Sequence, residues 1–253
     1  MKKAASFALG CKVNQYESEA IAELFAEKGY EIVGIDEEAD VYVINTCTVT
    51  NFGDKKSRQL IRKVKRQNEN AIVAVVGCYA QTAPKELMEI AGVNLVIGTK
   101  DRAQIVEMVE QYDRANGVEN HVSDIMKERV FEPLSIQKLA NRTRAYLKIQ
   151  DGCSQYCSYC IIPYARGRVR SRRKEEVVEE VKTLAGNGCK EVVLTGIHLS
   201  SYGIDHGSTL QELILAVHEV AGVERIRLGS LEPGIITEDF VKTLSALPKF
   251  CPH

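Results

Sequence analysis

The sequence has no stretch of apolar residues long enough to cross a membrane as a helix. A spanning helix needs about 18 or more such residues in a row, and no window of the 253 residues contains them. The start, Met1-Lys2-Lys3, leads into a strand pattern rather than into the apolar core of a signal peptide. These absences exclude a membrane span and a membrane partner, and they predict a protein of the cytoplasm.

Net charge and paired histidines are also lacking. The formal net charge is -1, so the composition gives no overall attraction to nucleic acid, and any basic surface must be local. The five histidines form no pair at ligand spacing, which argues against a histidine-based metal site. The hydrophobic content of 45% allows buried cores, and the length is enough for about two domains.

Cysteine is present in quantity, with eight residues. In a reducing compartment, metal ligands or core thiols are favoured over disulfides. Three of the eight, Cys153, Cys157 and Cys160, have the spacing Cys-x3-Cys-x2-Cys, which lets one short loop turn three thiolates toward one point. A closed zinc site takes four ligands, whereas an iron-sulfur cubane held by three leaves one iron open to bind substrate. A zinc or purely structural site is the alternative.

The first part of the sequence alternates strand and helix patterns. Short apolar runs rich in β-branched residues predict strands at 4–9, 41–46, 71–76 and 94–97, and helical spacing lies between them. One such helix is expected at 18–28, with Gly29 as its C-cap. The alternation predicts an α/β fold, with a doubly wound parallel sheet over residues 1–112.

Cys11, Cys47 and Cys78 each lie just past one of these predicted strands. The carboxyl ends of parallel strands share one edge of an open α/β sheet, and ligands bind at that edge. We therefore expect the three thiols to converge as a second metal site, although cysteine is also a common buried residue.

The rest of the sequence predicts a linker and a second domain. Periodicity weakens between 113 and 141, where we place a linker without a function of its own. From 142 to 253 strands at 144–150, 191–195 and 225–228 alternate with helices at 174–185, 209–221 and 237–247. Repeated β/α units predict a partial or full β/α barrel whose working loops follow the strands.

Two basic runs interrupt the neutral balance. The run from Lys55 to Arg66 is interleaved with apolar residues at helical spacing, so it suits a solvated helix face as well as RNA contact. The second run directly follows the cysteine loop, where a bound polyanion would lie beside the reactive centre. Its predicted RNA-binding residues are Arg166, Arg168, Arg170, Arg172 and Arg173.

The cysteine loop, with Tyr159 before its last cysteine, resembles the signature of the radical S-adenosylmethionine (SAM) superfamily. Four segments together resemble the methylthiotransferases within that superfamily, along essentially the whole chain. These segments are Leu9 to Asn14, Asn45 to Cys47, Val76 to Gln81, and Cys153 to Gly167. The stretch from Gly10 to Glu17 is most similar to the branch that modifies N6-threonylcarbamoyladenosine at position 37 of tRNA.

The resemblance implies two [4Fe-4S] clusters. Cys11, Cys47 and Cys78 would hold an auxiliary cluster, and the Cys153 set would hold the cluster that binds SAM. One electron would cleave SAM to a 5'-deoxyadenosyl radical that abstracts hydrogen, and a methylthio group would replace that hydrogen. The other expected partners are tRNA, a sulfur donor and an electron donor such as flavodoxin or ferredoxin.

The resemblance also implies the remaining contacts and a truncated barrel. The expected SAM contacts are Tyr159, Gly196, Ser230 and Glu232. The chain stops where the family's fourth barrel strand begins, and no residues remain for its carboxy-terminal RNA-binding domain, so we expect an incomplete radical SAM barrel. Cys189 and Cys251 match no ligand position and are expected to be structural thiols.

Three other functions remain open from the sequence. A methylthiotransferase acting on isopentenyladenosine in tRNA, or on an aspartate of a ribosomal protein, would share both cysteine sets. A non-catalytic iron-sulfur electron-transfer protein would bind clusters but would not cleave SAM.

Overall fold

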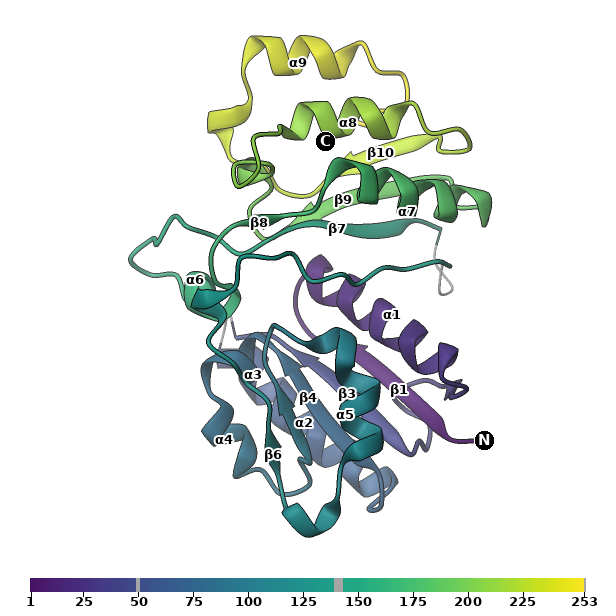
Figure 1. The fold of residues 1–253 in the computed structure, drawn as a ribbon, viewed down its shortest axis with the longest axis vertical. Helices are drawn as coiled ribbons and strands as arrows, with labels where there is room; N and C mark the ends of the chain where they lie inside the picture. The colour runs from purple at the N-terminus through teal and green to yellow at the C-terminus, as the bar shows by residue number, and fades with distance from the viewer. Residues whose placement is uncertain (49–50, 139–142, 253) are drawn as a thin grey trace. The chain divides into compact units, whose positions relative to one another are not determined.

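The computed structural model describes residues 1–48, 51–138 and 143–252 (Figure 1). The chain forms two compact units. The first contains residues 1–128, 132–134 and 155–167, and the second contains 129–131, the described part of 135–154, and the residues from 168 onward. The predicted boundary between linker and second domain, at 141 and 142, lies outside the described residues.

The first unit is built on a six-stranded parallel sheet. Its strands are β1 (Lys3–Ala8), β2 (Glu31–Ile32), β3 (Val41–Thr46), β4 (Ile72–Gly77), β5 (Leu95–Ile97) and β6 (Glu119–Asn120). They lie in the order β2-β1-β3-β4-β5-β6, and every pair is parallel. All six residues of β3 are buried, as expected for a central strand covered on both faces.

Helices cover both faces of this sheet. On one face α1 (Lys12–Glu27) and α5 (Ile105–Gln111) pack residues such as Phe25 and Val109 against the strands. On the other face α2 (Asn51–Gln67) and α4 (Pro84–Met88) contribute Ile61 and Leu87, together with α3 (Cys78–Thr82). The predicted doubly wound α/β fold is confirmed.

Two details of this unit differ from the sequence expectation. Helix α1 begins at Lys12 rather than near residue 18, because its first turns bury the polar residues Asn14 and Glu17, which an apolar pattern does not reveal. The predicted linker contains the 3-10 helices η2 (Arg114–Asn116) and η3 (Ile125–Lys127) and strand β6, which pairs with β5 and extends the sheet.

The second unit has a four-stranded sheet in the order β10-β9-β7-β8. Strands β7 (Ala145–Asp151), β9 (Glu191–Gly196) and β10 (Arg225–Leu228) are parallel, and β8 (Arg170–Ser171) pairs antiparallel with β7. The short β8 was not predicted, since two residues give no periodicity to read.

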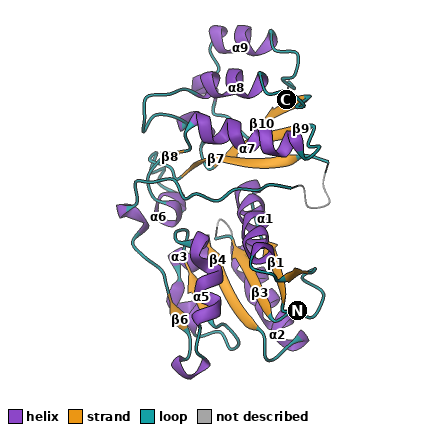
Figure 2. Cartoon of the chain, turned by 45° about the vertical axis from the view of Figure 1, so that its right-hand side comes forward, coloured by secondary structure: helices purple, strands orange, loops and turns teal. Residues whose placement is uncertain are grey.

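Helices α7 (Lys174–Gly186), α8 (Leu210–His218) and α9 (Glu238–Ser245) alternate with these strands (Figure 2). Thr209 and Glu212 form a capping box that starts α8. The β/α repeat agrees with the predicted partial barrel. Within the described residues, no helix is long and apolar enough to cross a membrane.

Candidate functional site

Three cysteines lie at the carboxyl edge of the first sheet. Strands β1, β3 and β4 are neighbours whose ends are in register, with Ala8 opposite Asn45 and Thr46 opposite Gly77. Cys11 is the N-cap of α1, Cys47 directly follows β3, and Cys78 begins α3. Cys11 is exposed, Cys47 half-buried and Cys78 buried, so the structure places all three on the predicted edge.

Gly10 allows the loop after β1 to lie directly against Cys47. Its φ angle is +99°, a left-handed value that favours glycine. A Cβ atom at this position would lie 2.6 Å from the Cys47 Cβ and 2.8 Å from its Sγ. A side chain here would therefore displace the second thiol of the set.

Asn14 connects the ends of β1 and β3. Its Nδ2 donates to the carbonyl oxygens of Leu9 at 2.8 Å and Thr46 at 3.0 Å. Its Oδ1 lies 3.6 Å from the Cys11 Sγ, which donates to it. One buried amide thus fixes the spacing of the two strand ends that carry Cys11 and Cys47.

Arg166 reaches the same edge from the last residue of α6 (Ile162–Arg166), which belongs to the first unit. Its side chain is fully buried. Nη1 donates to the Glu17 Oε1 at 2.5 Å, Nη2 to the Asn14 Oδ1 at 2.5 Å, and Nε to the Cys78 Sγ at 3.1 Å. The guanidinium therefore contacts one cysteine directly and a second through Asn14.

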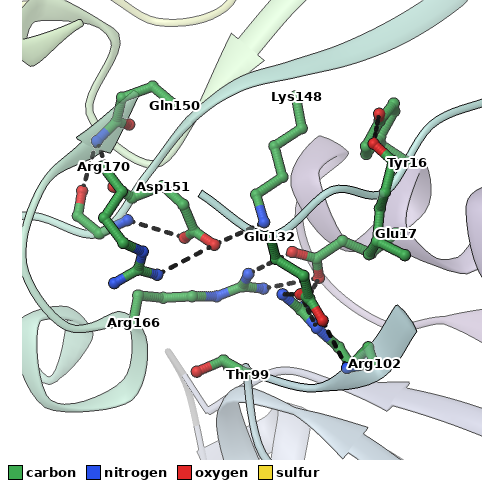
Figure 3. A network of polar contacts seen from close by, with 12 residues as sticks. Tyr16, Glu17, Thr99, Arg102, Glu132, Lys148, Gln150, Asp151, Arg166 and Arg170 are labelled. Atoms are coloured by element: carbon green, nitrogen blue, oxygen red, sulfur yellow. Dashed lines mark hydrogen bonds and ion pairs between the residues drawn. The ribbon is translucent and has the colours of Figure 1, made fainter. Parts of the chain in front are cut away.

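Glu17 is the centre of a balanced charge network, shown in Figure 3. Its buried carboxylate accepts from Arg166, and its Oε2 also lies 2.6 Å from the Nη1 of Arg102. Arg102 in turn pairs with Glu132 through Nε at 2.9 Å and Nη2 at 2.5 Å. Two carboxylates and two guanidiniums compensate one another, which is what a buried charge requires.

The environment of Cys78 opposes ionisation in the absence of a metal. Burial is the main cause that raises the pKa of its thiol to about 11; Arg166 lowers this pKa, and the nearby Cys11 and Glu17 raise it. Iron ligation needs the thiolate. The Arg166 guanidinium lowers the pKa of the Cys78 thiol and so favours the thiolate.

The second cysteine set follows β7. Gly152 has a φ angle of +72° and turns the chain into the loop, in which the Cys160 amide donates to the Cys157 carbonyl at 2.9 Å. Cys153 is buried and belongs to the second unit, whereas Cys157 is exposed, Cys160 is half-buried, and both belong to the first unit. Tyr159, a predicted SAM contact, is 90% exposed.

Gln150, the penultimate residue of β7, links this loop to the loop after β9. Its buried Nε2 donates to the carbonyls of Asp151 and Gly152, and its Oε1 accepts from the His198 amide at 2.7 Å. A Cβ on Gly196 would lie 2.9 Å from the Gln150 Cβ. The predicted Gly196 is thus required for close packing against the end of β7.

Asp151 anchors the start of the cysteine loop. Its Oδ1 accepts from the Gly152 amide at 2.8 Å, and its Oδ2 pairs with the Nζ of Lys148 at 2.6 Å and the Nη2 of Arg170 at 3.6 Å (Figure 3). All three charged side chains are buried. A carboxylate held by two cations fixes the backbone from which Cys153 extends.

The remaining predicted SAM residues lie in the loop after β10. Ser230 and Glu232 are both exposed. The Glu232 carboxylate lies 2.9 Å from the Nε2 of His198, and its amide donates to the Ser200 hydroxyl at 2.9 Å. The loops after β9 and β10 therefore meet through His198 and Glu232, while Ser230 lines an apolar cavity of about 750 Å³.

Three of the five arginines predicted to bind RNA are buried and ion-paired instead. Arg166 pairs with Glu17, Arg170 with Asp151, and Arg172 with Glu180 of helix α7. A buried guanidinium that already holds a carboxylate is not presented to a phosphate in this structure. Arg168 and Arg173 are exposed, and RNA contact by these two stays a prediction.

Two observations at the first cysteine set fit an iron-sulfur cluster. Its donors are three cysteine thiols, and Gly10 has no side chain that would crowd Cys47. Among the residues that the structure describes, no three histidine, cysteine or acidic side chains stand close enough to hold a single metal ion. A four-iron cluster is larger than an ion, and each thiolate binds a different iron, so its ligands need not converge on one atom.

Sequence reasoning missed the polar residues that organise both cysteine sets. They share no local signal, because some lie outside the predicted helices and strands and others fall on the polar side of an alternating strand pattern. These residues are Asn14, Glu17, Arg102, Glu132, Lys148, Gln150, Asp151 and His198.

Two family models match the chain in succession. Uncharacterized protein family UPF0004 matches residues 3–98, and the Radical SAM superfamily matches residues 147–250. These matches cover both cysteine sets.

Curated relatives match over the full chain. The threonylcarbamoyladenosine tRNA methylthiotransferase MtaB of Bacillus subtilis is 49% identical, covering 100% of this chain and 56% of that protein. The protein of the same name from Aquifex aeolicus is 41% identical, covering 99% of this chain and 61% of that protein. The chain thus spans somewhat more than half the length of these relatives.

A solved structure resembles the chain in fold. It is TsrM, a radical S-adenosylmethionine methyltransferase from Kitasatospora setae, with a TM-score of 0.64 and 17% identity. The alignment covers 97% of this chain and 57% of that one. At this identity the likeness concerns the fold alone.

The packing of Gly10 against Cys47 leads to a stability prediction. Gly117 also has a positive φ angle but has no atom within 4 Å of an added Cβ, so Gly117→Ala should cost only the backbone strain of about 1–3 kcal/mol. Gly10→Ala should lower the free energy of unfolding by about 1–3 kcal/mol more, because of overlap with Cys47. Urea unfolding of the metal-free protein measures both, and equal losses would contradict the packing argument.

Proposed function

The chain belongs to the radical SAM methylthiotransferases, and we propose that the protein adds a methylthio group to N6-threonylcarbamoyladenosine at position 37 of tRNA. The observation that carries the proposal is the presence of two cysteine sets, one following three neighbouring parallel strands and one in the loop after β7. The two relatives described above carry the name of this activity, and this chain aligns with them from end to end.

In this proposal Cys11, Cys47 and Cys78 hold an auxiliary [4Fe-4S] cluster, and Cys153, Cys157 and Cys160 hold the cluster to which SAM binds. When bound, the clusters and SAM supply the electron, the radical chemistry and the transferred sulfur. The protein's own residues hold and orient these groups. Gly10 leaves room beside Cys47, and Arg166 donates to Cys78.

Residues of the second unit position the SAM side. Gln150 holds the loop after β9 against the start of the cysteine loop, and the buried Lys148–Asp151 pair fixes the backbone before Cys153. Gly196, Ser230 and Glu232, at the carboxyl ends of β9 and β10, are proposed SAM contacts, because ligands bind at this end of β/α units. Tyr159, exposed before the last cysteine, is the fourth.

The proposed substrate is tRNA, with an electron donor such as flavodoxin or ferredoxin and a sulfur donor as further partners, all in the cytoplasm. Arg168 and Arg173 are the proposed phosphate contacts, since their guanidiniums are exposed. The neighbouring Arg170 and Arg172 support this segment from within, through Asp151 and Glu180.

Metal analysis tests the cluster assignment without substrate. The anaerobically reconstituted chain should contain about eight irons, since two four-iron clusters are expected, and about four after Cys153, Cys157 and Cys160 are replaced by alanine. Cys189→Ala is the matched control. Its buried thiol donates to the Glu191 carbonyl, and its loss should leave the iron content unchanged. Zinc in place of iron, or no loss in the triple variant, would exclude the assignment.

Nucleoside analysis tests the substrate. Transfer RNA from a strain that lacks the protein should contain N6-threonylcarbamoyladenosine without its 2-methylthio derivative, and the full-length gene should restore the derivative. The Cys78→Ala gene should not restore it, because one ligand of the auxiliary cluster is lost. Mass spectrometry of the nucleosides gives the result.

The same experiment separates the alternatives. If isopentenyladenosine in tRNA or an aspartate of a ribosomal protein loses its methylthio group instead, the protein belongs to another branch of the family. If every methylthio group persists and the purified protein binds clusters without cleaving SAM, it is an electron-transfer protein.

A further inference from the structure

Arg166 combines a buried position with a place immediately after the second cysteine motif. It is the last residue of α6, a single-turn helix that has Pro163 in its first turn and that Gly167 ends with a φ angle of +70°. Thr99 donates from its hydroxyl to the Ala165 carbonyl at 2.7 Å, which holds the neighbouring residue in place. The direction in which Arg166 extends is therefore fixed by the backbone.

Each of the three nitrogens of the Arg166 guanidinium donates a hydrogen bond to a buried partner. Its Nη1 and Nη2 hold Glu17 and Asn14, and its Nε, 3.1 Å from the Cys78 Sγ, donates to sulfur. Nη1 and Nη2 both contact the Glu17 carboxylate, the latter at 3.2 Å, so these contacts already pair the two charges without the cysteine. The third contact points to a task at the cysteine.

We propose that Arg166 is a positioning residue for the first cysteine set. It donates a charge-assisted hydrogen bond to the Cys78 sulfur. Helix α6, which follows the second cysteine motif, thereby becomes part of the surroundings of the first cluster. The inference rests on the proposed function, because it requires a cluster on Cys11, Cys47 and Cys78. Hydrogen bonds to ligating sulfurs, and nearby positive charge, stabilise the reduced cluster and raise its reduction potential.

The reduction potential of that cluster tests the inference. The full-length protein with Cys153, Cys157 and Cys160 replaced by alanine is the parent, since it retains one cluster, and the potential is measured by EPR-monitored titration. At a fixed solution potential, Arg166→Gln should lower the ratio of reduced to oxidised cluster about tenfold. For a one-electron couple this is a fall of about 59 mV in the reduction potential. Arg166→Lys should lower it less, because it keeps the charge but loses the fork.

Arg114→Gln is the matched control. Arg114 is an exposed arginine of the same unit that donates to the Asn70 carbonyl rather than to a cysteine, so the potential should not change. Where Arg166→Gln does not fold because Glu17 loses a partner, the double variant with Glu17→Gln removes both charges and should show a smaller fall in potential, caused by loss of the hydrogen bond to the Cys78 sulfur.

The outcomes distinguish the two proposals. Iron bound in the parent, with a potential that neither Arg166 variant changes, overturns the role of Arg166 alone. No iron in the parent overturns the proposed cluster and this inference with it. A fall in the Arg166 variants, absent from Arg114→Gln, supports both.

Discussion

The first unit depends on one buried carboxylate, that of Glu17. Removing a carboxylate from water is unfavourable unless cations and donors replace the water, and Arg166, Arg102 and Asn45 do so. Loss of one partner of such a pair typically costs about 3–5 kcal/mol. Glu17 and Asn14 lie one turn apart on α1, and Arg166 holds both. The contacts of Glu17 therefore also fix the Asn14 side-chain amide, which accepts from the Cys11 thiol and donates to the Thr46 carbonyl at the end of β3.

The strand order explains why the cysteines lie where they do. The chain places β2 on one side of β1 and β3 on the other, so the order reverses between β1 and β3. The connections after these two strands cross to opposite faces of the sheet, and ligands of doubly wound folds bind at the carboxyl ends of strands at such a point. Cys11 and Cys47 flank this point, and Cys78 follows the next strand.

The sequence allowed prediction of features that depend on local pattern. Strand periodicity located the sheet, and its register brought Cys11, Cys47 and Cys78 to one edge as expected. Pairing between distant charges could not be predicted in this way. Arg166 and Glu17 are 149 positions apart. A run of arginines predicts an exposed basic surface from sequence alone, even where, as here, three of the five are buried against carboxylates.

In the proposed arrangement, the cysteines at the strand ends of the first sheet hold an iron-sulfur cluster beside Arg166. A crystal structure of the anaerobically reconstituted protein, with anomalous data at the iron edge, tests it most directly. We predict iron peaks bonded to Cys11, Cys47 and Cys78, with the Arg166 Nε still facing the Cys78 sulfur. Iron absent from these three thiols, or Arg166 turned away from Cys78, would exclude this arrangement.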